Sequence, residues 1–140
     1  MSSVDMRSAN FLRMISTRLA TTQQARIRHS CALLIVAFVL HTIVDPALTY
    51  LAVVQFEVAY ETNPFMRQWL AAGAIPFIFI HLPMYAFCGV ALILLRWFYR
   101  TATEWEQYII YSVSMIGFSG LICWGILLAL NGVRVLWLGM

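Results

Sequence analysis

Charge is what this 140-residue sequence has least of: only 11% of its residues are Asp, Glu, Lys or Arg, and none is Lys. Soluble globular proteins contain about 25% charged and about 45–50% apolar residues, whereas 62% of this chain is hydrophobic. A short soluble domain could not hide so much apolar surface, because small domains bury only about two-thirds of the surface exposed on unfolding. The composition excludes a secreted disulfide scaffold, a nucleic-acid module and most soluble enzymes, and it indicates an integral membrane protein.

Reactive and cofactor-binding motifs are also missing. The three cysteines, Cys31, Cys88 and Cys123, are widely spaced and form no C-x-x-C pair, and thiols within apolar helices usually behave as small hydrophobic groups. The sequence has no Gly-rich phosphate loop, no G-x-S-x-G, no c-type haem motif and no H-E-x-x-H or E-x-x-H. No cofactor is predicted, and an intramembrane enzyme would lack a recognisable nucleophile or metal motif.

Three long apolar stretches occupy most of the chain, at residues 31–54, 74–96 and 107–130. Each reaches the roughly 20 residues that an α-helix needs to cross a bilayer. We therefore predict an all-α membrane protein, with a three-helix transmembrane domain over residues 31–140 and the lipid bilayer as its surroundings.

The nine arginines are distributed unevenly along the chain. Seven lie in residues 1–30 or in the second connection: Arg7, Arg13, Arg18, Arg26, Arg28, Arg96 and Arg100. Cytoplasmic loops carry an excess of basic residues, so we expect the N-terminus in the cytoplasm and the C-terminus outside the cell membrane. The net charge of +3 reflects this bias and does not suggest a nucleic-acid partner.

Residues 1–30 form a basic segment rich in Ser and Thr. Phe11, Leu12, Ile15 and Leu19 fall on one helical face, which predicts an amphipathic helix on the cytoplasmic surface. A cleaved organellar transit peptide has a similar composition and stays an alternative.

The connection between the first two spans, residues 57–73, contains its own helix signals. Asn63 is a good N-cap, and Pro64 suits the first helical position. Gly73 is a good C-terminal stop. These signals predict a short interfacial helix over residues 64–72.

Asp45 lies within the first span, where an ionised carboxylate costs about 2.5–3.5 kcal/mol on insertion scales. His41 precedes it by four residues and Thr49 follows it by four, so the three side chains share one helical face. Pro46 lies inside the same helix, and it should free a backbone carbonyl one turn back and kink the span.

His81 is expected in the second span at about the depth of Asp45, and Glu57 and Glu61 lie four residues apart at the external mouth. Two imidazoles and one carboxylate, from His41, Asp45 and His81, could bind zinc or iron. The same cluster could instead carry protons or cations. A purely structural interpretation has Asp45 hydrogen-bonded to His81 and His41 bonded to a backbone carbonyl.

Two short motifs occur in order around this region. D-P-A-L-T-Y begins at Asp45, and E-T-N-P begins at Glu61. They resemble the D-x-x-x-T and E-x-N-P patterns of a prokaryotic membrane-protein family called domain of unknown function 5658, over residues 40–95. The resemblance implies Asp45, Thr49, Glu61, Asn63 and Pro64 as its marked positions, and it implies no activity. The family often has a Lys in the next span, near the place of His81.

The third span is rich in small residues, which let membrane helices approach closely. They are Ser112, Ser114, Gly117, Ser119, Gly120, Cys123 and Gly125. We expect a non-catalytic accessory or assembly subunit that packs against other membrane subunits or further copies of itself. The alternative is an ion, proton or metal-handling protein that uses His41, Asp45, His81 and Glu61.

Overall fold

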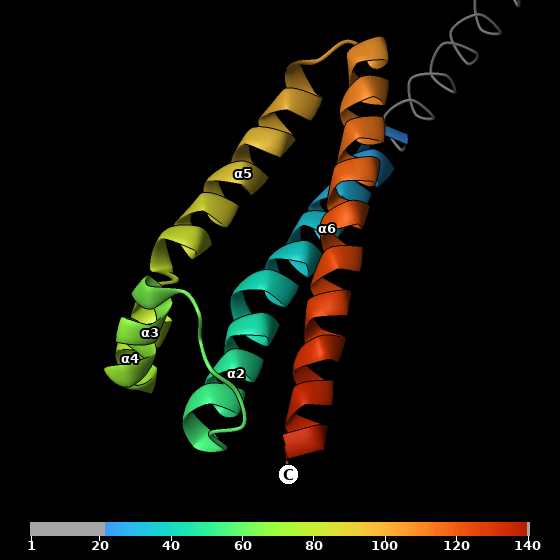
Figure 1. Cartoon of the computed structure of the whole chain (residues 1–140). Helices are drawn as coiled ribbons and strands as arrows, with labels where there is room; N and C mark the ends of the chain where they lie inside the picture. Colours follow the sequence, from blue (N-terminus) through green and yellow to red (C-terminus); the bar gives the residue numbers. More distant parts are fainter. Residues whose placement is uncertain (1–21, 140) are drawn as a thin grey trace, which may run out of the picture.

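The structure, a computed structural model, describes residues 22–139. Three helices there are long and apolar enough to span a membrane: Thr22–Gln55, Ala74–Thr101 and Glu104–Gly139. They run in alternating directions and form an open bundle (Figure 1). This confirms an all-helical membrane protein with three candidate spans. The helices are longer than the predicted apolar stretches, because residues 22–30, 97–101, 104–106 and 131–139 are also helical.

The first helix changes its winding around Asp45. Residues 22–39 are α-helical and lead into a π-helical turn, η1 (Leu40–Val44); α2 (Asp45–Tyr50) and a second π-helical turn, η2 (Leu51–Gln55), follow. Pro46 stands in the first turn of α2, where its missing N–H cannot bond back into the preceding turn. The expected disturbance at this proline therefore takes the form of a widened turn, a feature that often marks functional sites.

The second span is preceded by α3 (Pro64–Ala71) and is itself divided into α4 (Ala74–Phe79) and α5 (Leu82–Thr101). Gly73 separates α3 from α4 with a φ of 105°, which suits a residue without a Cβ. Pro83 lies in the first turn of α5, and the chain makes a turn at Ile80 and His81 just before it. The predicted second span is present as the candidate span Ala74–Thr101, and this turn divides it into two helical pieces.

The third span, α6 (Glu104–Gly139), packs along the first helix (Figure 1). Gly125 and Gly132 face Leu40 and Leu48: a Cβ added at Gly125 would lie 2.8 Å from the Leu40 Cβ, and one at Gly132 would lie 3.1 Å from the Leu48 Cβ. Gly139 faces Val58 in the same way. The three glycines are spaced by seven residues and form one seam, here called the glycine seam. Gly125 and Gly132 let α6 approach the first helix closely, and Gly139 lets it approach the loop that follows that helix.

The second span diverges from the third along its length, and α5 meets α6 mainly near their connection (Figure 1). Near that connection, Tyr99 is fully buried and its hydroxyl lies 2.8 Å from the Ser30 Oγ. The Gln23 side-chain amide donates to the Tyr99 carbonyl at 2.7 Å. These bonds tie the end of α5 to the start of the first helix.

The predicted amphipathic surface helix falls mostly on residues 1–21, which lie outside the described residues. Residues 22–30, the remainder of that segment, are helical and continuous with the first span. The predicted helix between the first two spans is present as α3, with Ala72 as its C-cap residue.

Candidate functional site

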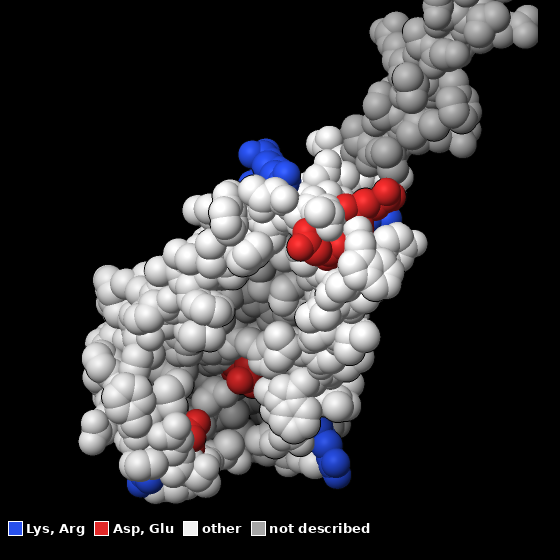
Figure 2. Space-filling model, turned by 90° about the horizontal axis from the view of Figure 1, so that it is seen from above, with Lys and Arg blue, Asp and Glu red and all other residues white. Residues whose placement is uncertain are grey.

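A cavity of about 410 Å³ lies between the first helix, the loop before α3 and the break in the second span. Its lining comprises His41, Thr42, Asp45, Pro46, Thr49, Glu61, Asn63, Met66, Phe77, His81 and Met84. The space-filling view shows acidic groups set in a hollow of an otherwise uncharged region (Figure 2). The volume greatly exceeds the roughly 10–15 Å³ needed for one water molecule, so the space can hold a solvated ion or a small organic molecule.

Six of the eight residues singled out in the sequence line this cavity: His41, Asp45, Thr49, Glu61, Asn63 and His81. Glu57 and Pro64 are not among the lining residues. Within residues 22–139, no three His, Cys, Asp or Glu side chains are grouped closely enough to hold a metal ion. The metal candidates His41, Asp45 and His81 therefore share a cavity without forming a compact ligand set.

Asp45 is half-buried and has no hydrogen-bond or ion-pair partner among the described residues. The charged and titratable groups that act on it through space are His41, Glu61 and His81. The purely structural interpretation of the sequence expected a hydrogen bond between Asp45 and His81. Among the described residues, the two side chains form no such bond. A carboxylate in a membrane-spanning helix is normally paired. Because Asp45 has no such partner among the described residues, its carboxylate oxygens are open to a ligand.

His41 joins the cavity to the third span. Its Nε2 lies 2.9 Å from the carbonyl oxygen of Leu121 in α6. Because a carbonyl only accepts, Nε2 carries the proton, and in the neutral ring Nδ1 is left as an acceptor. The backbone partner expected for His41 is present, and it comes from another helix.

The His81 side chain is held by Phe77, a residue of the same span. Its Nδ1 lies 2.8 Å from the carbonyl of Phe77, one turn earlier, and its ring packs edge-on against the Phe77 ring at 5.1 Å between centroids. The carbonyl again accepts, so the Nε2 of a neutral His81 is an acceptor. In their neutral forms, the two histidines thus offer lone pairs rather than N–H groups for further bonding.

The loop that closes the cavity is ordered by local hydrogen bonds. The Asn63 Oδ1 accepts from the backbone N–H of Phe65 at 3.0 Å, which confirms the predicted N-cap of α3. The Glu61 Oε1 accepts from the N–H of Asn63 at 2.7 Å. This bond holds Glu61 in a fixed position at the cavity wall, and its Oε2 accepts no hydrogen bond from residues 22–139.

Tyr85 connects the two spans that enclose the cavity. Its hydroxyl donates to the Thr42 carbonyl at 3.2 Å. In a regular helix this carbonyl would accept from residue 46, but Pro46 has no N–H to donate. The Tyr85 ring also packs edge-on against Phe38 at 5.3 Å. Sequence reasoning missed Tyr85, although a freed carbonyl within a membrane signals that a donor is needed nearby.

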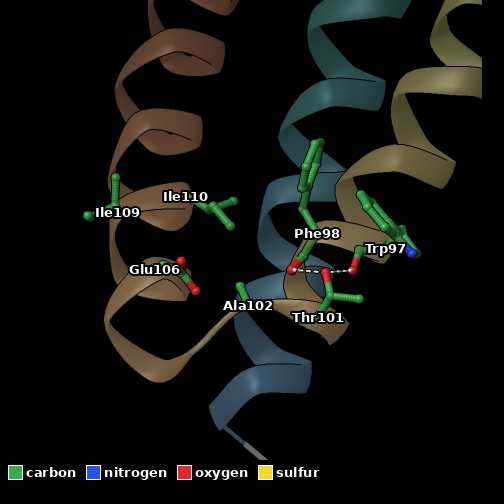
Figure 3. Close-up of a pocket in the computed structure, with 7 residues that line it drawn as sticks. All are labelled: Trp97, Phe98, Thr101, Ala102, Glu106, Ile109 and Ile110. Carbon is green, nitrogen blue, oxygen red and sulfur yellow. Dashed lines mark hydrogen bonds between the residues drawn. The ribbon is translucent and has the colours of Figure 1, made fainter.

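A separate cavity of about 390 Å³ lies at the corner between α5 and α6. Its lining is mostly apolar, with Trp97, Phe98 and Ile110 prominent (Figure 3). The polar side chains of Thr101 and Glu106 already have local partners: the Thr101 hydroxyl donates to the Trp97 carbonyl, and the Glu106 carboxylate accepts from the Thr103 N–H and hydroxyl, both at 2.7 Å. The second arrangement is a helix-capping box that starts α6, so this corner has a structural role.

Comparison with known proteins adds a family but no activity. Searches of curated proteins and of solved structures found no match. The family model described as Domain of unknown function (DUF5658) matches residues 36–134, a stretch that contains both short motifs and every residue lining the polar cavity. The chain is therefore a member of the DUF5658 family.

Proposed function

We propose that this membrane protein binds a small organic cation with an ammonium group in the polar cavity between its first two spans. The observation that carries the proposal is the lining of the cavity. It contains two carboxylates, from Asp45 and Glu61, and two imidazoles, and it contains no Arg.

The hydrogen-bonding pattern favours a ligand that donates. Asp45 has open carboxylate oxygens, and each neutral histidine has one nitrogen left as an acceptor. A primary ammonium carries a positive charge and three donors, so it complements this set in both respects. Charge-assisted bonds of this kind are stronger than neutral ones.

The test measures binding of radiolabelled methylammonium to the protein in lipid nanodiscs. Asp45→Asn and Glu61→Gln each keep the side-chain shape and remove a charge. We expect each to weaken binding by about tenfold, corresponding to about 1.4 kcal/mol. Glu57→Gln is the matched control, because Glu57 is an exposed carboxylate in the same loop that does not line the cavity.

Two results would contradict the proposal. One is equal binding by wild type, Asp45→Asn and Glu61→Gln. The other is equal competition by tetramethylammonium, which has the same charge and no donors, because the acceptor set would then have no role.

A non-catalytic accessory or assembly subunit is the second candidate function. The observation that favours it is the exposure of the spans: Gly117 and Gly120 of α6 have nothing within 4 Å of an added Cβ, so that face can accept another helix. Native purification from the membrane tests it, and recovery of the chain solely as a monomer would count against it.

We also propose the orientation given by the arginines. The start of the first helix and the α5–α6 connection face the cytoplasm, and α3 lies at the external interface. Arg96 and Arg100 near the end of α5 support this orientation through the basic bias of cytoplasmic segments. The polar cavity then opens nearer the external side.

A further inference from the structure

An apolar groove of about 460 Å³ lies directly beside the polar cavity, between the first helix and the second span. Its apolar lining includes Ile43, Ala47 and Leu51 from the first helix and Ile78 from α4. The groove is formed by membrane-spanning segments, where the surrounding medium consists of lipid tails.

The groove and the polar cavity have a common wall. Thr42, Pro46, Phe77 and His81 line both spaces. One face of this wall adjoins the carboxylates, and the other adjoins aliphatic side chains. The two spaces are therefore immediate neighbours, with hydrogen-bond acceptors on one side of these four residues and hydrocarbon on the other.

We propose that the ligand is an amphiphile, with a primary ammonium head in the polar cavity and an unbranched aliphatic tail in the adjoining groove. This inference rests on the proposed cation binding and specifies the class of ligand. An amphiphile already resides in the bilayer, so its head is presented to the cavity at a high effective concentration. Charge complementarity with Asp45 and Glu61 selects a cationic head over an anionic one.

The volume of the groove, about 460 Å³, is close to that of a single turn of an α-helix about 10 Å across, roughly 420 Å³. An aliphatic chain can lie inside a space of this size, whereas a helix of a second copy could only cover it with one face of its side chains.

The experiment uses dodecylamine that carries a photoactivatable diazirine in the middle of its tail. The full-length protein in nanodiscs is irradiated, and mass spectrometry locates the labelled residues. We expect labels on the groove residues Ile43, Leu51 and Ile78, and loss of those labels when excess methylammonium occupies the cavity. Ala47→Trp, which fills the groove, should lower this labelling by about tenfold and leave methylammonium binding unchanged.

Ala32→Trp is the matched control, since Ala32 is exposed on the same helix and lines neither space. Equal labelling of the groove by the corresponding dodecanoic acid would overturn the inference, because the groove would then accept any lipid tail. Labelling unaffected by Ala47→Trp would also overturn it. In both cases methylammonium binding that still depends on Asp45 leaves the proposed function standing, whereas loss of that dependence contradicts the proposed function itself.

Discussion

Pro46 determines the hydrogen bonding of the residues around it. It has no N–H to donate to the Thr42 carbonyl, and the Tyr85 hydroxyl of the neighbouring span donates to that oxygen at 3.2 Å instead. One residue of the first span thereby creates a directed contact with the second. The same contact fixes one side of the wall between the polar cavity and the apolar groove.

Tyr85→Phe should destabilise the protein by about 0.6 kcal/mol, the average for interhelical hydrogen bonds in membranes, and by no more than about 1.7 kcal/mol, the largest such value. The loss should be smaller in a Pro46→Ala background, because Ala has an N–H that can bond the Thr42 carbonyl within the helix. Reversible unfolding in mixed micelles, arranged as a double-mutant cycle, measures the difference. An identical cost in both backgrounds would contradict the link between Pro46 and Tyr85.

The residues of the cavity could be predicted from the sequence to different extents. Asp45 was conspicuous because a carboxylate is costly in a membrane span, and the cap at Asn63 followed from residue type. The partner of His41 could not be predicted, since the Leu121 carbonyl is a backbone group that any residue would supply. Phe77 and Met84 line the cavity as ordinary apolar residues, and nothing in their identity distinguishes them from lipid-facing ones.

Among the helices, α6 has two faces that differ in what their glycines contact. Gly125 and Gly132 belong to the glycine seam against the first helix, whereas Gly117 and Gly120 face open space. The sequence indicated many small residues but not which face was used, because the seam repeats every seven residues and contains no G-x-x-x-G pair. Only the placement of Leu40 and Leu48 against α6 distinguishes the two faces.

Gly125→Val should separate α6 from the first helix, since even a Cβ would lie 2.8 Å from that of Leu40. Overpacking of this kind typically costs about 1–3 kcal/mol. Gly117→Val is the matched control on the same helix, and it should leave unfolding of the isolated protein nearly unchanged. Unfolding in mixed micelles measures both variants, and equal destabilisation would show that the seam is not the main contact of α6.

In the whole molecule, three helices of alternating direction place contacts between arginine and tyrosine at both ends of the bundle. Arg26 lies over the Tyr108 ring at 4.3 Å near the start of α6, and Arg67 lies over the Tyr60 ring at 4.6 Å in the first connection.

The number of spans could be predicted because an apolar run of about 20 residues with few charges is typical of a membrane-spanning helix. The break in the second span could not be placed, because both α4 and α5 are apolar and Pro83 is compatible with a continuous helix that is merely kinked.

The proposed orientation predicts the accessibility of single cysteines introduced into a cysteine-free variant. With Thr103→Cys, in the α5–α6 connection, the thiol should react with a membrane-impermeant maleimide only after the cells are opened. With Thr62→Cys, in the first connection, it should react in intact cells. The reverse pattern would contradict the orientation, and it would place the polar cavity nearer the cytoplasmic side.

The bond between His41 and the Leu121 carbonyl also has a consequence for biogenesis. The first two spans are synthesised before Leu121, so the imidazole lacks its acceptor until the third helix enters the bilayer. The glycine seam that positions this helix likewise forms last. His41 is therefore oriented only at the end of membrane insertion, and a chain that stops after the second span contains every residue that lines the cavity without the contact that orients His41.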